Sequence, residues 1–348
     1  MALLLERGYN GTQSGGREDL SDLIANVDAR STPFTSMAKK GKKPGNVLMG
    51  WQMDAYEDPQ VTGTVDGTDV DMTSAGSFTN PAKNRALMQN YAQIFRRVFR
   101  VSSLANEIQV VAGVKSELAN GIAKKLVEIK RDMEMTFLND ADAQVDNGTN
   151  AYLTKSMGSF LHASGTGGGG LDITVPSAFR CTAIDTTASA SLAESNVQDV
   201  LKTLFTNTGI IRDYDLLLGT SLKRAFTNFT QSVTSTAATE SSHDVTASPI
   251  KTFNQEATSK SYINCIDLFE GDFGRLRLHP STFIAESGSA VAFKGYAIPF
   301  DQVEIRYGKL PQIKELTDNG GGPARLIEAV AALVVYNPKG VGYFNGAS

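Results

Sequence analysis

Residues that carry out chemistry in proteins are scarce in this sequence. Its 348 residues include two cysteines and three histidines. Cys181 and Cys265 lack the spacing of metal ligands, which favours two semi-buried thiols in a reducing compartment. None of His162, His243 and His279 stands four residues from a second metal-binding side chain on a predicted helix, so a zinc site is not expected.

Motifs for catalysis or cofactor binding are also missing. Ser221 lies between a predicted strand and a predicted helix, as a hydrolase nucleophile does, but residues 219–223 lack the second glycine of a nucleophile elbow. The glycine run at residues 167–170 lacks the Gly-Lys-Ser/Thr of a phosphate-binding loop. Residues 318–320 resemble the start of a calcium loop, but no glutamate closes it at the required spacing. We therefore expect no enzyme, no catalytic residue, no metal site and no cofactor.

Long apolar runs and an excess of positive charge are absent as well. The longest later apolar run, residues 329–335, has the length of a strand and is too short to span a bilayer. The apolar stretch at residues 2–5 ends at Glu6, so we expect no signal peptide and no membrane partner. A net charge of −4 excludes the strongly basic class of nucleic-acid-binding proteins. The expectation is a soluble protein made in the cytoplasm, with one large domain or two medium ones.

What the sequence does contain is a strong separation of charge over residues 51–100. The ionisable side chains of residues 51–82 are all acidic: Asp54, Glu57, Asp58, Asp66, Asp69 and Asp71. Those of residues 83–100 are all basic: Lys83, Arg85, Arg96, Arg97 and Arg100. Residues 47–53 and 93–102 have the pattern of strands and flank a loop rich in Asp, Gly, Thr and Ser, which predicts a long hairpin.

This predicted hairpin carries little apolar material at its tip, so it is poorly suited to packing on its own subunit. Complementary charge instead favours docking on a neighbouring subunit. We therefore predict that the acidic and basic residues just named make inter-subunit contacts. A weak cation site at Asp66, Asp69 and Asp71 is a less favoured interpretation.

The next segment has the strongest helical pattern of the chain. Apolar residues follow one another on a single stripe: Val114, Leu118, Ile122, Leu126, Ile129, Met133 and Phe137. No proline interrupts residues 114–140, so a helix of this span would reach on the order of 40 Å.

The rest of the chain mixes helices and strands, so the fold class is α+β. After the glycine run, apolar residues at helical spacing predict a helix that ends at Gly209. A strand at residues 215–218, a helix at 222–229 and strands at 262–269 and 275–279 follow. The last long strands, at residues 302–307 and 326–336, are expected to pair with the long-helix domain.

Several of these pieces, in this order, carry a family resemblance. They are Arg17-Glu18-Asp19-Leu20-Ser21-Asp22, Thr32-Pro33-Phe34, Trp51-Gln52 in the hairpin, Lys115-Ser116-Glu117-Leu118 through Lys130-Arg131-Asp132-Met133-Glu134, and Phe273-Gly274-Arg275-Leu276. Together they resemble the major capsid proteins of tailed bacteriophages, which have the Hong Kong 97-type fold. The resemblance implies an N-terminal arm (1–46), an extended loop (47–103), a peripheral domain with a long spine helix (104–170), an axial domain (171–299) and returning peripheral strands (300–348).

The resemblance also implies a function. It is that of a major capsid protein that assembles with itself, as hexamers and pentamers, into an icosahedral head enclosing double-stranded DNA without sequence-specific binding. Scaffolding, portal and cement proteins are further candidate partners, and the head would assemble in the host cytoplasm and become part of the virion. The alternatives are an encapsulin-like compartment shell, another virion protein such as a decoration or tail component, and a soluble hydrolase. The isopeptide crosslinks of some members are not expected, because no motif places a Lys, an Asn and a carboxylate together.

Overall fold

The computed structural model describes residues 31–70, 84–107, 116–164, 173–187, 192–229, 252–254, 261–263, 266–284 and 293–346. Asp71, Lys83, the predicted arm up to residue 30 and the glycine run at residues 167–170 lie outside these ranges.

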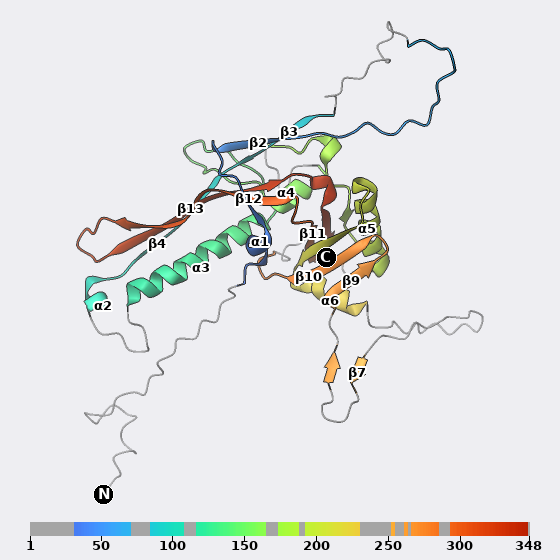
Figure 1. Ribbon diagram of the computed structural model, residues 1–348. Helices are drawn as coiled ribbons and strands as arrows, with labels where there is room; N and C mark the ends of the chain where they lie inside the picture. The colour runs from blue at the N-terminus through green and yellow to red at the C-terminus, as the bar shows by residue number, and fades with distance from the viewer. Residues whose placement is uncertain are drawn as a thin grey trace.

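Two sheets organise the described chain (Figure 1). The first has the strand order β1-β12-β13-β4 and contains β1 (Lys39–Gly41), β12 (Val303–Leu316), β13 (Ala324–Val335) and β4 (Gln93–Arg100). The second has the order β5-β14-β11-β6-β10-β9 and contains β5 (Ile184–Asp185), β14 (Gly342–Gly346), β11 (Phe293–Ile298), β6 (Arg212–Leu218), β10 (Gly274–Pro280) and β9 (Leu268–Gly271). Two strand pairs stand apart, β2 (Leu48–Met53) with β3 (Ala86–Tyr91) and β7 (Thr252–Asn254) with β8 (Ser261–Ile263).

The predicted long helix is present and lies along one face of the first sheet (Figure 1). This helix, α3 (Glu117–Phe137), starts at Ser116, whose hydroxyl accepts a hydrogen bond from the Ala119 N–H as an N-cap. Its second half buries Ile129, Met133 and Phe137 in the main core, whereas the apolar residues of its first half are half-buried. Short helices α1 (Pro33–Met37), α2 (Ser103–Glu107) and α4 (Met157–Leu161) lie around it.

The second sheet has its own core, because two helices cover one of its faces. Side chains of α5 (Glu194–Thr208) and α6 (Thr220–Asn228) pack with those of β6 and β10, including Leu201, Phe226, Leu216 and Leu276. As predicted, α5 ends at Gly209, whose φ of 68° lies in the left-handed region that glycine adopts readily. All six residues of β11 are buried, since alternate side chains such as Tyr296 and Ala297 enter different cores.

The C-terminal strands join the long-helix region, as expected. β13 pairs with β12 on one side and with β4 on the other. The final strand, β14, instead pairs with β11 in the second sheet. Between them stands the 3₁₀ helix η4 (Pro338–Gly340); another, η2 (Ser177–Phe179), precedes β5.

The predicted pairing of residues 47–53 with residues 93–102 is wrong. β2 pairs with β3, a strand that the sequence did not reveal, while β4 pairs with β13. The reason is that β3 buries the polar side chain of Asn90 beside Met88, so it lacks a clean alternation of apolar and polar residues. The charged segment is therefore divided between an arm and a sheet strand.

Candidate assembly interface

The acidic half of the charged segment forms an exposed arm, defined here as residues 54–70. It leaves the end of β2 and loops away from the body of the molecule (Figure 1). All its residues are exposed, and residues 54–65 have no regular secondary structure. Val61 is 100% exposed and Val65 is 77% exposed, so the arm also presents apolar side chains to solvent. An arm of this kind is available for contact with another molecule.

Five of the six acidic residues predicted to make contacts are placed on this arm. They are Asp54, Glu57, Asp58, Asp66 and Asp69. Asp54 forms an ion pair with Arg85 across the base of the arm, at 3.0 Å between Oδ2 and the guanidinium. Both side chains are about half exposed, so this pair contributes little to folding.

Three of the five basic residues, Arg96, Arg97 and Arg100, lie in β4 and have acidic partners within the same chain. Arg97 donates two hydrogen bonds of 2.6 Å to Asp132 of α3, and the bond to Asp132 raises the pKa of this guanidinium. Arg96 pairs with Glu328 of β13 at 2.7 Å, and Arg96 and Lys309 hold the pKa of that carboxyl below its usual value. These arginines therefore have acidic partners within their own subunit, which the sequence pattern did not indicate.

Arg100, the last residue of β4, also has an acidic partner within the chain. It lies 3.4 Å from Asp318 and donates a hydrogen bond to the carbonyl of Gly322. The backbone N–H groups of Gly322 and Gly320, together with Arg100, hold the pKa of Asp318 below its usual value. The loop at residues 318–320, whose sequence resembles only the start of a calcium loop, is a tight turn in which Asp318 accepts backbone hydrogen bonds.

β4 is an edge strand of the first sheet. Its one neighbour in the sheet, within the described residues, is β13. A groove of about 540 Å³ runs beside its first half, between β4 residues 93–97 and the α3 residues Asp132, Met135 and Thr136. Ile94 and Met135 line it and are each 54% exposed. An edge strand beside a groove with both polar and apolar lining is suited to receive another extended segment.

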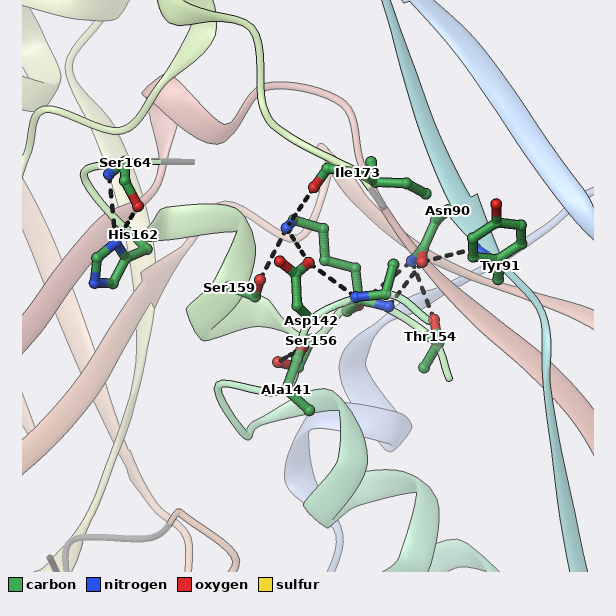
Figure 2. A network of polar contacts seen from close by, with 12 residues as sticks. Asn90, Tyr91, Ala141, Asp142, Thr154, Ser156, Ser159, His162, Ser164 and Ile173 are labelled. Carbon is green, nitrogen blue, oxygen red and sulfur yellow. Dashed lines mark hydrogen bonds and ion pairs between the residues drawn. The ribbon is translucent and has the colours of Figure 1, made fainter. Parts of the chain in front are cut away.

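The strand pair at the base of the arm is fixed by Asn90, which is fully buried (Figure 2). Its amide nitrogen donates to the carbonyl of Leu333 at 2.7 Å and to the hydroxyl of Thr154 at 3.0 Å. Its amide oxygen accepts from the backbone N–H groups of Lys155 at 2.7 Å and of Tyr91 at 2.8 Å. Asn90 thereby joins β3 to β13 and to the loop before α4.

Lys155 continues this network into the core, and Figure 2 labels its partners Asp142, Ser159 and Ile173. Its ammonium group is fully buried and donates to Asp142 at 2.5 Å, to Ser159 at 2.8 Å and to the carbonyl of Ile173 at 3.0 Å. Burial lowers the pKa of this lysine, while the contact with Asp142 opposes that shift. Because three acceptors meet the three donors of an ammonium group, the arrangement suits a structural ion pair rather than a reactive amine.

A second buried acid holds the segment that precedes the arm. The carboxylate of Glu134, on α3, accepts hydrogen bonds of 2.8 Å from the backbone N–H groups of Phe34 and Thr35 at the start of α1. Burial raises the pKa of this carboxyl. Glu134 therefore seats the Thr32-Pro33-Phe34 segment on the long helix.

A third polar cluster joins the second sheet to the end of α3. Lys294 of β11 pairs with Asp140 just after α3, and the Tyr343 hydroxyl lies 3.3 Å from the same carboxylate. The rings of Tyr296 and Tyr343 stack with centroids 5.4 Å apart, and the Tyr296 hydroxyl donates to the carbonyl of Leu138. Desolvation raises the pKa of both phenols, so they remain neutral donors.

The described residues contain no group of three or more His, Cys, Asp and Glu side chains arranged to hold a metal ion. Cys181 is buried, donates to the Val341 carbonyl, and has its pKa raised to about 12 by burial. Nor does any helix in the described ranges have the length and apolar character needed to cross a membrane.

Comparison with known proteins decides the family. The model of a family described as SU10 major capsid protein matches residues 7–348, almost the whole chain. The chain belongs to the SU10 major capsid protein family. This SU10-family chain is also 31% identical over 144 residues to the major capsid protein of Escherichia phage Phieco32. That match covers 41% of this chain and 38% of the relative.

Solved structures share the fold of this SU10-family chain. A chain from the capsid of a native GTA particle superposes with a TM-score of 0.57 at 11% identity, covering 96% of each chain. A chain from Mycobacterium phage Adephagia gives a TM-score of 0.55 at 12% identity, covering 95% of this chain and 94% of that one. The holo-SrpI encapsulin of Synechococcus elongatus PCC 7942 gives 0.53 at 8% identity, covering 95% and 91%. The predicted capsid family and Hong Kong 97-like α+β fold are confirmed.

Proposed function

We propose that this chain is a major capsid protein that assembles with itself into the icosahedral head shell of a tailed bacteriophage enclosing double-stranded DNA. The family match along residues 7–348 is the observation that carries this proposal. The exposed arm supports it, because its apolar side chains are solvent-exposed in the single subunit and would be buried by a neighbour. Repeated contacts of this heterologous kind close into rings and then into a shell.

The parts of the chain have separate roles in this proposal. Residues 1–46 reach to another subunit, residues 47–103 form the extended loop, and residues 104–170 with 300–348 build the peripheral domain around α3. Residues 171–299 form the axial domain at the centres of hexamers and pentamers. The separate cores of the two sheets support two domains, although β14, which lies within residues 300–348, pairs with β11 of the second sheet.

The acidic and basic residues of the charged segment at residues 51–100 remain the proposed contact residues. The acids are Asp54, Glu57, Asp58, Asp66, Asp69 and Asp71, and the bases are Lys83, Arg85, Arg96, Arg97 and Arg100. The ion pairs of β4 change how this is tested, since reversing its arginines would also place like charges beside Asp132, Glu328 and Asp318. Reversing arm acids tests assembly without that complication.

The shell in this proposal performs no catalysis and binds no cofactor. It encloses DNA without reading its sequence, assembles in the host cytoplasm, and becomes part of the virion. Scaffolding, portal and cement proteins are its further proposed partners.

Electron microscopy and light scattering of the full chain, expressed alone and together with the other head proteins of its phage, test the proposal. Closed particles, or rings of five and six subunits, are the expected products. A chain that stays monomeric and folded under both conditions would contradict the proposal and return attention to a soluble enzyme.

An encapsulin-like compartment is the second candidate, because the SrpI encapsulin shares the fold. The contents of purified particles separate the two. A phage head isolated from lysed host cells should contain double-stranded DNA, whereas a compartment shell should contain protein cargo.

A further inference from the structure

The outer face of β4 presents two exposed apolar side chains with a fixed spacing. Ile94 is 54% exposed and Val98 is 52% exposed, four residues further along. Side chains four residues apart in a strand lie on the same face, about 13 Å apart. Arg96 lies between them on that face and pairs with Glu328 of β13.

The arm contains a short segment with the same spacing. Residues 60–65 read Gln-Val-Thr-Gly-Thr-Val, in which four of the six residues are β-branched and so favour a strand. Val61 and Val65 stand four residues apart, with Gly63 between them. A Cβ added at Gly63 would meet no atom within 4 Å, so no neighbouring atom of the same subunit would clash with a larger side chain at this position.

We propose that residues 60–65 of one copy add to the free edge of β4 of a second copy as a further strand of the first sheet. This inference rests on the proposed function and names the surface that receives the arm. Backbone hydrogen bonds to the unpaired edge hold the added strand, as in other cases of strand addition.

The side chains fit this pairing in either strand direction. Val61 and Val65 lie beside Ile94 and Val98 on the outer face, and apolar cross-strand pairs of this type stabilise a sheet. Gly63 then lies beside Arg96, where the missing side chain leaves room for the guanidinium and its bond to Glu328. Thr62 and Thr64 lie on the opposite face, which is the face that β4 turns toward α3.

Charge favours the same pairing. Asp58 precedes the segment and Asp66 follows it, so acidic groups stand at both of its ends. β4 carries Arg96, Arg97 and Arg100, whose side chains remain about half exposed despite their ion pairs. Such complementarity speeds encounter and fixes orientation more than it adds affinity.

The geometry of the base favours a second copy over the same one. β3 runs from the base of the arm directly into β4, with only Ala92 between them. Its six residues span about 20 Å, so the arm leaves from the end of the ribbon far from β4. Figure 1 shows the arm extending away from β4.

Disulfide trapping tests the proposal in the full chain. Two chains in a Cys265→Ser background, each with one introduced cysteine besides the buried Cys181, are coexpressed, one with Val61→Cys and the other with Ile94→Cys or Val98→Cys. Neighbouring strands bring such residues within disulfide distance. We expect Val61→Cys in assembled particles to form a crosslinked dimer with only one of the two β4 cysteines, at position 94 or 98. The position that reacts shows whether the added strand runs parallel or antiparallel to β4. Thr62→Cys paired with the same partners is the matched control, since position 62 lies on the other face.

Particles that form without a crosslink from position 61 to 94 or 98, or that crosslink equally from position 62, would overturn this inference alone. If the wild-type chain forms no particles when it is coexpressed with the other head proteins of its phage, both the proposed function and this inference would be overturned. In one chain that carries both Val61→Cys and the reactive β4 cysteine, a crosslink within that chain, seen as a shift without dimer, would contradict the choice of a second copy.

A second variant tests the fit without cysteine. Gly63→Leu should lower the yield of particles about tenfold or more, because its side chain would collide with Arg96 in the added strand. Gly45→Leu is the matched control, since a Cβ at Gly45 also meets no atom within 4 Å and Gly45 lies outside the segment. Equal particle yields from the two variants would contradict the proposal.

Discussion

The arm and the strand pair at its base differ in how the chain holds them. The arm is exposed along its whole length, whereas the base is held by the buried side chains of Asn90 and Lys155. A rigid base gives the arm a defined origin and direction, and an exposed arm keeps its contacts available to a partner. The residues that stabilise the fold therefore differ from those that are available for assembly, although the arm and its base adjoin each other.

The largest expected effect comes from the buried cation at the base. Lys155→Met leaves Asp142 charged and buried without its partner, so the free energy of unfolding should fall by about 3–5 kcal/mol. Urea denaturation of the unassembled chain measures it. The double variant Lys155→Met with Asp142→Leu is the control and should recover much of the loss. Wild-type stability in the single variant would show that the ion pair does not fix the base.

A smaller loss is expected at Asn90. Asn90→Ala leaves the Lys155 N–H and the Leu333 carbonyl without their partner in a buried site, at a cost of about 2–3 kcal/mol. The control is Asn84→Ala, which removes one exposed hydrogen bond to Ala55 near the arm and should change stability by less than about 0.5 kcal/mol. Similar losses of unfolding free energy in Asn90→Ala and Asn84→Ala would contradict the distinction between a stable base and an exposed arm.

Glu134 should give a smaller effect that depends on pH. Burial raises the pKa of its carboxyl above the usual 4.5, so between these two values the folded chain holds a proton that the unfolded chain has released. The free energy of unfolding attributable to Glu134 should therefore fall as pH rises through that window and stay level above it. Subtracting the pH profile of Glu134→Gln from that of the wild type isolates this slope. Glu128→Gln, on the same helix but partly exposed, is the control, and an identical slope there would contradict the assignment.

The smallest effect on folding is expected on the arm. Asp66→Lys with Asp69→Lys should change the free energy of unfolding by less than about 0.5 kcal/mol, because both residues are exposed. The same change should reduce particle formation. The reduction should become smaller as the salt concentration rises, because salt screens exposed charges that are more than about 8–10 Å apart. Light scattering at two ionic strengths measures this. Normal assembly of the double variant would contradict a role for the arm acids.

The parts predicted from the sequence are those with a local pattern. The apolar stripe of α3 and the glycine that ends α5 were both read from neighbouring residues, because helix periodicity and capping act within a few positions. The strand character of β2, β4 and β13 was also readable. The exposure of the arm followed from its acidic, turn-rich composition.

The parts that were missed depend on contacts between distant residues. Nothing local marks Asn90 or Lys155 as buried, since their partners include Leu333 and Asp142. The predicted pairing of β4 is wrong for the same reason. β4 pairs with β13, in which Glu328, the partner of Arg96, stands 232 positions further along the chain. The groove beside β4 exists because α3 and β4 pack together, which no short window of sequence specifies.

The long helix, the separation of acidic and basic residues, and the family follow from the sequence without its folded form. These properties are written in the order and spacing of side chains. The tertiary structure alone decided that the acids stay exposed while the arginines pair within the subunit, and that β4 ends a sheet. The physical reason is that pairing, burial and edges arise only when segments far apart in the chain come together and desolvate one another.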